Sequence, residues 1–337
     1  MPQPPTQPPA SDHLRILQIN LNKSESAHLE LVNDDLSKNY DVILIQEPHT
    51  TTFGNIRTPN QFRQVYPGGR QDPNTKVRSG IWVNREIDTG CWKELPIPDT
   101  GDITAIQLTG NYGRLTIFNV YSPCENDSAE AKLHQYLQNR GQDIYTGATD
   151  HMIWAGDFNR HHPLWDRAED VHLFTRQATA AADKLIELLG TYGMVMALPK
   201  DLPTLQHMVT KKFSRPDNVF CTENLANLFT TCEVDYNHQP TKTDHYPIKS
   251  TIELTHDSTP SSPAYNFRMA DWDDFNKNLK ARIADIIPPR HLLTKEEFDK
   301  ATIALTEAIK DTIRTRIKLQ MPLPDKKRGQ NSKKEEK

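Results

Sequence analysis

The sequence predicts a layered α/β domain with mixed sheets, followed by a helical C-terminal region. Across residues 14–254, short apolar runs typical of buried strands alternate with segments of helical period. Runs of strands are mixed with helices, which favours mixed sheets over a strictly parallel βαβ array. After residue 254 the apolar residues fall at helical spacings, so the second region is expected to be all helical.

Each expected element follows from its local pattern. Runs such as LRILQI at 14–19 and VILI at 42–45 are almost wholly apolar, as in buried strands. The expected strands are residues 14–19, 42–45, 80–83, 103–108, 114–120, 152–155, 219–220, 229–234 and 247–254. Helical periods predict helices at 27–36, 130–137 and 178–189. The segment after the second strand is rich in Gly, Pro and Asn and is expected to be a long loop region.

Composition places the domain boundaries. The predicted organisation is a disordered Pro-rich leader (1–12), the α/β domain (13–255), a Ser/Pro linker (256–265), a helical region (266–320) and a disordered charged tail (321–337). Two amphipathic helices are expected in the helical region, on either side of Pro288-Pro289. They carry Trp272, Phe275, Leu279, Ile283 and Ile286 in one, and Phe298, Thr302, Leu305, Ile309, Ile313 and Ile317 in the other. Because the linker follows the last strand, these helices are expected to be separable from the activity of the main domain.

Overall composition excludes several classes of protein. The chain has 337 residues with 36% hydrophobic and 25% charged residues, and its mean hydropathy is -0.69. No apolar stretch is long enough for a membrane span, and the start of the chain lacks the features of a secretory signal. Four cysteines show no close pairing, so they are expected to be reduced thiols in an intracellular protein.

Charge is unevenly distributed along the chain. Residues 265–337 carry 17 Lys and Arg against 12 Asp and Glu, whereas residues 1–264 carry 23 against 32. An acidic domain repels a polyanion unless its carboxylates surround a metal and local basic patches make the contact. Two such patches exist, one between Arg57 and Arg85 and one between Pro203 and Pro216. Either patch by itself is also compatible with a solvated loop.

Polar residues follow the expected strands directly, where α/β sheets gather ligand sites. Each one alone has an ordinary explanation, such as a solvated strand end, an Asx turn or a structural Asp-His pair. Together, acceptors, acids and one histidine at five strand edges indicate a metal-assisted hydrolase. The residues are Asn20 and Asn22, Glu47, Tyr121, Asp157 and Asn159, and Asp244 and His245.

Seven short motifs occur in one order along residues 14–254. They are QINLNKS (18–24), IQEP (45–48), NVYSP (119–123), GDFNRHHPLWD (156–166), PT (203–204), SRPD (214–217) and TDHYPI (243–248). In this order they resemble the endonuclease/exonuclease/phosphatase superfamily, and specifically the apurinic-like endonuclease domain of non-LTR (LINE-type) retrotransposons. NFRMADWDDF (266–275) resembles the connector that follows the nuclease in such polyproteins.

The resemblance implies a four-layer α/β sandwich with two mixed β-sheets flanked by helices, plus a C-terminal helical extension. It also implies a centre that binds Mg²⁺, with Mn²⁺ as a substitute, through Glu47, Asn20 and Asp244. Oxygen ligands of this kind suit that ion. Two implied catalytic residues act on the attacking water: Asp157 orients or deprotonates it, and Asn159 positions it. Two act on the phosphate: His245 stabilises its charge, and Tyr121 donates a hydrogen bond to it. Asp217 is implied to fix the tautomer of His245.

The resemblance further implies contacts to DNA. The residues expected to make them are Asn22, Arg160, His162, Thr204, Lys211, Lys212 and Ser214. Two positions depart from the family pattern. Asn22 stands where apurinic-type relatives carry an acid, and Asn218 stands where an aliphatic residue is more frequent. His161, His162 and Trp165 lack the spacing of a zinc site and are interpreted as a loop that shapes the DNA-facing side.

The predicted function is Mg²⁺-dependent phosphodiester hydrolysis, by a nuclear DNA endonuclease that nicks one strand of duplex DNA and leaves a 3′ hydroxyl. Its partners would be duplex DNA and a reverse transcriptase supplied by the same or another element, with no membrane. Two alternatives remain open from the sequence. One is a small-molecule or lipid phosphodiesterase of the same superfamily, and the other is a catalytically unused remnant of a retroelement.

Overall fold

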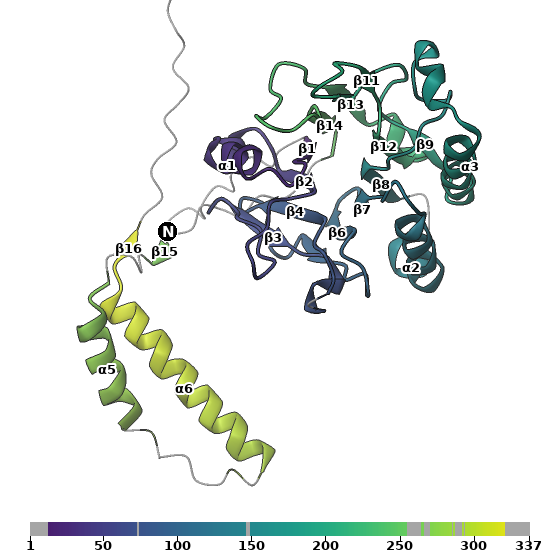
Figure 1. The fold of residues 1–337 in the computed structure, drawn as a ribbon. Coiled ribbons are helices and arrows are strands. Elements are labelled where there is room, and N and C mark those ends of the chain that lie inside the picture. Colours follow the sequence, from purple (N-terminus) through teal and green to yellow (C-terminus); the bar gives the residue numbers. More distant parts are fainter. Residues whose placement is uncertain are drawn as a thin grey trace, which may run out of the picture. The chain divides into compact units, whose positions relative to one another are not determined.

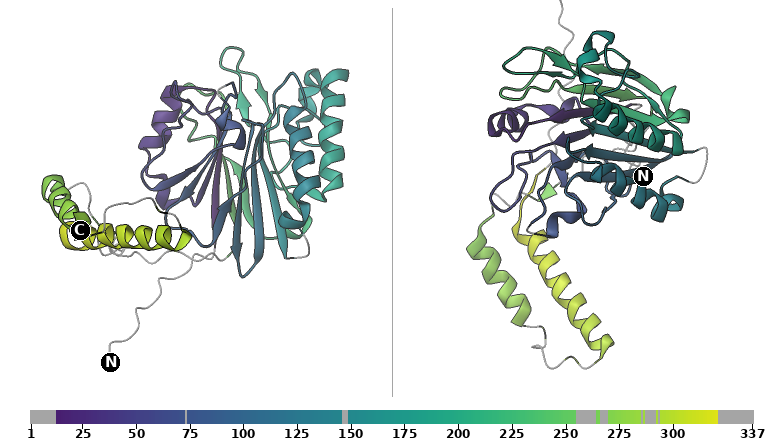
Figure 2. Two further views of the ribbon diagram at one scale, coloured as in Figure 1. Left: turned by 90° about the horizontal axis from the view of Figure 1, so that it is seen from below. Right: turned by 45° about the vertical axis from the view of Figure 1, so that its right-hand side comes forward.

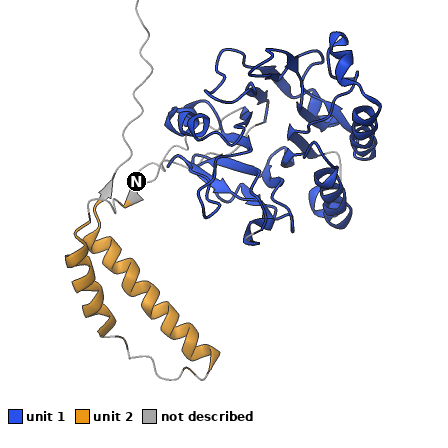
Figure 3. Ribbon diagram, in the orientation of Figure 1, with its two compact units in different colours: residues 1–259 blue, residues 260–337 orange. Residues whose placement is uncertain are grey.

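The computed structural model describes residues 13–72, 74–145, 149–254, 264–265, 270–284, 286, 292 and 294–320. The chain divides into two compact units, residues 1–259 and 260–337 (Figure 3). The predicted leader 1–12, tail 321–337 and linker residues 256–263 lie outside the described residues. No helix in the described part of the chain has the length and apolar character needed to cross a membrane.

Two six-stranded mixed sheets form the first unit (Figure 1). In each sheet one central pair of strands is parallel, β1 with β2 and β7 with β8, and the other neighbours are antiparallel. The first sheet has the order β13 (Phe229–Val234), β14 (Ile248–Ile252), β1 (Leu14–Asn20), β2 (Val42–Gln46), β4 (Ser79–Asn84), β3 (Phe62–Val65). The second has the order β5 (Trp92–Glu94), β6 (Ile103–Gly110), β7 (Gly113–Tyr121), β8 (Asp150–Asp157), β12 (Asp217–Thr222), β9 (Met194–Met196).

The sheets and helices are arranged in four layers (Figure 2, left). The two sheets face each other across one apolar core, to which both contribute Val, Ile and Leu side chains. Helix α1 (Glu25–Asn33) covers the outer face of the first sheet, and α2 (Ser128–Ile144) and α3 (Arg176–Thr191) cover the outer face of the second. The layered α/β fold and the mixed sheets that the sequence predicted are therefore confirmed.

Short elements complete the first unit. They are the 3₁₀ helices η1 (Leu36–Lys38), η2 (Gly68–Gln71) and η3 (Ala168–Leu173), the helix α4 (Glu223–Ala226), and the strands β10 (Leu205–Gln206) and β11 (Phe213–Ser214), which form a small hairpin. The long loop region expected after β2 is in fact interrupted by β3 and η2. Strand β3 has only two buried residues, Phe62 and Val65, at its ends, so no continuous apolar run marks it.

A side-chain N-cap at Ser24 explains where α1 begins. The Ser24 hydroxyl accepts a hydrogen bond from the Ala27 amide at 3.2 Å, which starts the helix at Glu25 rather than at the expected Ala27. The helix ends at Asn33, and the last apolar residue of the predicted span, Leu36, lies instead in η1. The residues between β1 and α1 therefore form a tight connection, which holds Asn22 and Lys23 in left-handed conformations.

The second unit is a pair of helices, α5 (Trp272–Ala284) and α6 (Lys295–Arg316), with a short strand pair, β15 (Ala264–Tyr265) and β16 (Leu319–Gln320). A capping box at Thr294 and Glu297 starts α6. The helices contact each other, with the Arg316 guanidinium donating to the Asn278 Oδ1 at 2.6 Å. The C-terminal helical region is thus confirmed.

A buried asparagine joins the two sheets of the first unit. The Asn119 side chain lies on β7 and is fully buried, yet its Nδ2 donates to the carbonyls of Ile45 (2.9 Å) and Gly80 (2.8 Å) in the other sheet. Its Oδ1 accepts from the Gln46 amide, and the Ser79 hydroxyl donates to its backbone carbonyl at 2.9 Å. This bridge fixes the position of β7 over β2 and β4.

The bridge predicts a large effect of Asn119→Ala on stability. The change leaves the carbonyls of Ile45 and Gly80 without this donor, and each buried group left unsatisfied costs about 1–3 kcal/mol. We expect urea denaturation to show a fall of about 3 kcal/mol in the unfolding free energy. The control is Asn111→Ala at the exposed turn before β7, which should change it by less than about 0.5 kcal/mol. Equal effects of the two changes would contradict the bridge.

Candidate active site

Strand ends from both sheets meet at one edge of the first unit. The parallel pair β1 and β2 ends at Asn20 and Gln46, which lie opposite each other, and the parallel pair β7 and β8 ends at Tyr121 and Asp157. Strand β12 runs antiparallel to β8 and begins at Asp217, directly opposite Asp157. Side chains that are far apart in the sequence therefore reach the same place.

Asp157 lies at the centre of this edge and is 2% exposed. Its Oδ2 accepts a hydrogen bond from the Asn20 Nδ2 at 2.7 Å, and its Oδ1 accepts from the Asn159 amide at 3.0 Å. Burial, and next the negative charge of Asp217, raise the pKa of Asp157 to about 7. A carboxylate with such a pKa can accept a proton at neutral pH, as a general base must.

A second buried carboxylate, Asp217, holds a histidine. Its Oδ2 lies 2.8 Å from the His245 Nδ1 and also accepts a hydrogen bond from the Thr204 hydroxyl at 2.7 Å. Burial lowers the pKa of His245, but the charge of Asp217 and its hydrogen bond outweigh this and raise the pKa to about 9. His245 is therefore a cation at neutral pH, and its other ring nitrogen is available as a donor.

Glu47 follows β2 and has the left-handed conformation, with φ of 45°. Its amide donates to the Arg78 carbonyl at 2.8 Å, and its carboxylate lies 2.6 Å from the Lys23 Nζ. Only 9% of the Glu47 side chain is exposed, against 65% of the Lys23 side chain. A nearly buried carboxylate thus follows the strand end opposite Asn20 and forms an ion pair with an exposed lysine.

Tyr121 ends β7 and is partly buried. Burial, together with the nearby carboxylates of Glu47 and Asp157, raises the pKa of the Tyr121 phenol far above its ordinary range. The hydroxyl therefore keeps its proton and can act as a donor. The Arg78 guanidinium lies 5.0 Å from the centre of the Tyr121 ring and is bound to Asp102 through Nε (2.6 Å) and Nη2 (2.8 Å).

The side-chain oxygen atoms at this edge suit a divalent cation that prefers oxygen ligands. Glu47, Asp157, Asp217 and Asp244 bring four carboxylates to this edge, and the Asn20 Oδ1 accepts a hydrogen bond from the Asn22 backbone amide at 2.8 Å. Ligand atoms of Asp157, Asp217 and His245 lie within 4.8 Å of one another, a second grouping that has the composition of a metal site. In this grouping the His245 Nδ1 and the Asp217 Oδ2 already bind each other at 2.8 Å. The predicted ligand set of Glu47, Asn20 and Asp244 stays a prediction beside it.

Comparison with known proteins follows this geometry. Residues 115–249 match the family model described as endonuclease-reverse transcriptase. The endonuclease domain of TRAS1, a telomere-specific non-LTR retrotransposon, has a TM-score of 0.56 at 22% identity, covering 72% of this chain and 99% of that one. The AP endonuclease LMAP from Leishmania major gives 0.55 at 14% identity, covering 72% and 88%. An AP endonuclease from Archaeoglobus fulgidus gives 0.51 at 19% identity, covering 72% and 100%.

The family-model match spans 135 of the 337 residues, and the solved structures share the fold of the first unit at 14–22% identity. No curated protein matches the sequence. The residues that the sequence predicted for a catalytic centre lie at the one edge described above. The roles given to these residues stay predictions.

The residues expected to contact DNA are distributed differently. Lys211 and Lys212 are exposed in the β10–β11 hairpin, and Ser214 is partly exposed in β11. Asn22 is exposed next to the centre, where its Nδ2 donates to the Asp244 Oδ1 at 3.3 Å. These four positions are accessible to a polymer bound over the edge.

Two of the expected DNA contacts need correction. Thr204 is fully buried, and its hydroxyl donates to Asp217, so it orients that carboxylate and does not face a ligand. Arg160 is 2% exposed and is enclosed by backbone carbonyls and Glu130. Both residues were predicted to contact DNA because they are polar and lie in a family motif. In the structure both side chains are buried and bind other parts of the protein.

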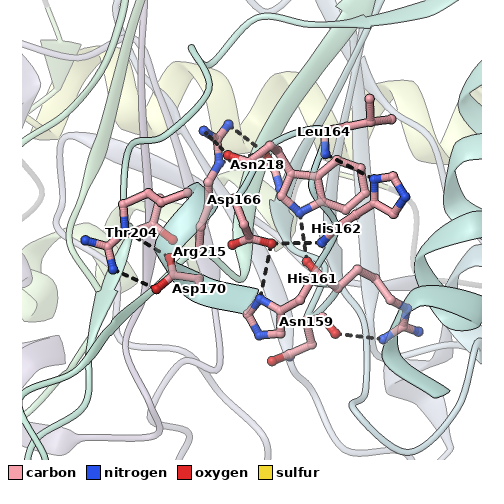
Figure 4. Close-up of polar contacts among 12 residues, drawn as sticks. Asn159, His161, His162, Leu164, Asp166, Asp170, Thr204, Arg215 and Asn218 are labelled. Carbon is pink, nitrogen blue, oxygen red and sulfur yellow. Dashed lines mark hydrogen bonds and ion pairs between the residues drawn. The ribbon is translucent and has the colours of Figure 1, made fainter. Parts of the chain in front are cut away.

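The HHPLW segment (161–165) is ordered by Asp166 (Figure 4). The Asp166 Oδ2 accepts from the His162 amide at 2.8 Å and lies 3.5 Å from the His161 Nδ1. The His162 side chain, 17% exposed, lies against the buried Trp165 ring. The segment thus forms a fixed loop beside Asn159, which leaves the DNA-contact prediction for His162 open.

Sequence reasoning gave no role to two residues that support the centre. Thr243 is buried, and its hydroxyl donates to the Asn20 carbonyl at 2.8 Å and accepts from the His245 amide at 3.3 Å. Asn218, a departure from the family pattern, is buried and its Oδ1 accepts from the buried Arg215 at 2.8 and 3.1 Å (Figure 4). Thr243 is the first residue of the TDHYPI motif, and its position next to Asp244 and His245 was the feature of the sequence that could have indicated its role.

The His245–Asp217 pair predicts a defined dependence on pH. NMR titration of the His245 ring nitrogens should give a midpoint near pH 9, and Asp217→Asn should lower it because the charge and its hydrogen bond are lost. The folded pKa lies above the ordinary 6.5. The pair therefore contributes stability that is full below about pH 6.5 and is lost as pH rises through about 9. A midpoint that Asp217→Asn leaves unchanged would show that another group holds the proton.

Proposed function

We propose that the protein is a divalent-metal-dependent DNA endonuclease of the retrotransposon type, which cuts one strand of duplex DNA and leaves a 3′ hydroxyl. The observation that carries the proposal is the buried Asp157 carboxylate, whose two oxygens are fixed by Asn20 and Asn159 beside the cationic His245. The matches to an endonuclease-reverse transcriptase family and to a retrotransposon endonuclease support the choice of substrate. Its partners would be genomic DNA in the nucleus and a reverse transcriptase that extends the new 3′ end.

Asp157 acts as the base. It takes a proton from water while the water oxygen bonds to phosphorus, and the bond from phosphorus to the 3′ oxygen breaks. The leaving oxygen takes a proton from solvent, which gives a 3′ hydroxyl and a 5′ phosphate. Asn159, whose own amide is bound to Asp157, holds its side chain beside the path of the water.

Two donors stabilise the phosphate. The cationic His245 donates from its Nε2 to a non-bridging oxygen, where negative charge increases in the transition state. Asp217 keeps the ring oriented through its Nδ1. The neutral phenol of Tyr121 donates to the same phosphate from the neighbouring strand end.

A divalent cation would be held by Glu47, Asn20 and Asp244. When bound, Mg²⁺ or Mn²⁺ supplies Lewis-acid stabilisation of charge on the phosphate and the leaving oxygen. Lys23, whose ammonium group lies 2.6 Å from Glu47, balances that carboxylate and has an exposed side chain that is free to move away.

The β10–β11 hairpin favours DNA over a small substrate. It begins directly after Thr204 and ends three residues before Asp217, so it lies next to the catalytic edge. Its tip carries exposed Met208 and Val209 beside Lys211. A basic hairpin with an exposed tip can bind phosphates that flank the cut and enter a groove.

Plasmid nicking tests the proposal. The parent protein should convert supercoiled plasmid to the open circle with Mg²⁺ or Mn²⁺, and chelator should abolish this. Asp157→Ala and His245→Ala should each lower the rate by about 10²–10³, since each removes a group that acts on the transition state. Glu47→Gln should raise the Mg²⁺ concentration needed for half-maximal rate.

Two outcomes would overturn the assignment. Nicking at full rate in excess chelator would exclude a metal-dependent mechanism. A parental rate for Asp157→Ala would exclude Asp157 as the base. A lipid-phosphate release assay runs beside the nicking assay, and activity there without nicking would identify a small-molecule phosphodiesterase instead.

The hairpin predicts a separate effect on binding. Lys211→Ala with Lys212→Ala removes two exposed cations, so the slope of log affinity against log salt should flatten by about one to two units. The control pair is Lys132→Ala with Lys184→Ala, two lysines on α2 and α3 whose side chains are 36% and 64% exposed. Fluorescence anisotropy with duplex DNA and chelator measures both pairs, and an unchanged slope would exclude the hairpin from the contact.

A further inference from the structure

A buried ion pair lies directly beside the catalytic edge. Arg160 is 2% exposed and Glu130, on α2, is 5% exposed, and the Arg160 Nη2 lies 2.9 Å from the Glu130 Oε1. The Ser122 hydroxyl connects the two, because it accepts from the Arg160 Nη2 at 3.0 Å and donates to the Glu130 Oε2 at 2.7 Å. We refer to Ser122, Glu130 and Arg160 as the buried ion-pair network.

The guanidinium also joins two catalytic loops. Its Nη1 donates to the carbonyls of Pro123 (3.2 Å) and Asn159 (3.1 Å), and its Nη2 donates to the Asn126 carbonyl at 2.7 Å. The loop that follows Tyr121 is thereby tied to the loop that follows Asp157. A planar group with five N–H donors can make such a set of bonds, whereas a lysine ammonium cannot.

Catalytic residues depend on this junction through hydrogen bonds of their own. The Asn159 Nδ2 donates to the Ser122 carbonyl at 2.9 Å, and the Ser122 amide donates to the Asp157 carbonyl at 2.7 Å. Tyr121 precedes Ser122 directly in the chain. A displacement of Ser122 would therefore move the side chain of Asn159, and with it the neighbouring Tyr121 and the backbone of Asp157.

We propose that Arg160 is a positioning residue for the reaction. Its ion pair with Glu130 holds Ser122 in place, and Ser122 in turn fixes the side-chain amide of Asn159 next to Asp157. The proposal rests on the proposed nuclease function for its kinetic consequence, but the positioning itself is a property of the protein without substrate. Misplacement of a catalytic group by about 1 Å can lower a rate about 10²-fold, so the network is expected to affect turnover strongly.

The competing explanation is that the pair only stabilises the fold. Breaking a buried pair costs about 3–5 kcal/mol wherever it lies, so loss of stability does not separate the explanations. The chain offers a control ion pair at the beginning of β7 and β8, the two strands whose ends precede Ser122 and Arg160. There Arg114, on β7, binds Asp150, on β8, through two bonds of 2.9 and 2.6 Å, and Asp150 is 4% exposed.

The kinetic test compares Arg160→Lys and Ser122→Ala with Arg114→Lys. Nicking rates are measured with saturating Mg²⁺ below each variant's melting temperature, and kcat and KM are determined separately. Arg160→Lys should lower kcat about 10²-fold with KM changed less than about threefold, and Ser122→Ala, which keeps both charges, should lower kcat less. Arg114→Lys, at a pair whose arginine is 28% exposed, should lower thermal stability at the parental kcat.

The second test needs neither metal nor DNA. In ¹⁵N-labelled protein with chelator, the Asn159 side-chain amide, assigned through Asn159→Asp, should give a resonance that is shifted by Ser122→Ala and Arg160→Lys but not by Arg114→Lys. If the parent does not nick DNA and these shifts still occur, the proposed function fails while the positioning stands. Unchanged Asn159 resonances, or a kcat for Arg160→Lys equal to that of Arg114→Lys, would overturn the positioning role.

Discussion

The packing of the two sheets in one fixed position is the constraint on which the rest of the structure depends. Asn20, Glu47 and His245 come from segments of the first sheet, and Asp157, Asp217 and Tyr121 from the second. Two short contacts of the centre, Asn20 to Asp157 and His245 to Asp217, both cross between sheets. Hydrogen bonds weaken steeply beyond about 3.2 Å, so sliding one sheet by a fraction of a residue would break both. Apolar side chains alone resist sliding weakly because their attraction has no direction, whereas the Asn119 bridge supplies direction.

The Asp157 carboxylate opposes the stability of the metal-free fold. Burial and Asp217 raise the pKa of Asp157, which means that the folded chain binds a proton there more tightly than the unfolded chain does. This group therefore weakens the fold as pH rises from about 4 towards 7. His245 carries the compensating positive charge and remains protonated across that interval. The arrangement places two titratable groups whose pKa values are both raised close together in one buried site.

Sequence reasoning located the centre because strand ends are visible in the sequence. Asp157 and Glu47 follow apolar runs directly, and the pairing of β1 with β2 and of β7 with β8 then brings them together. Burial of polar side chains is not visible in this way. Thr204 and Arg160 were predicted to face DNA, because a threonine or arginine within a motif gives no sign of whether its partner is a ligand or an internal carboxylate. Edge strands such as β3 were missed for a related reason, since Arg63 and Gln64 interrupt the apolar run between Phe62 and Val65.

The first and last strands of the α/β domain are neighbours, with Leu14 of β1 opposite Ile252 of β14. Chain entry and chain exit therefore lie side by side, at the end of β1 that is farthest from Asn20. A seven-residue strand is roughly 20 Å long, so both lie about that distance from the catalytic edge. A domain built in this way can be spliced between other segments of a polypeptide as a closed module, since its two attachment points meet and neither crosses the site. The same closeness makes it a natural subject for circular permutation, in which a short peptide joins the two old ends and new ends open at an exposed turn elsewhere.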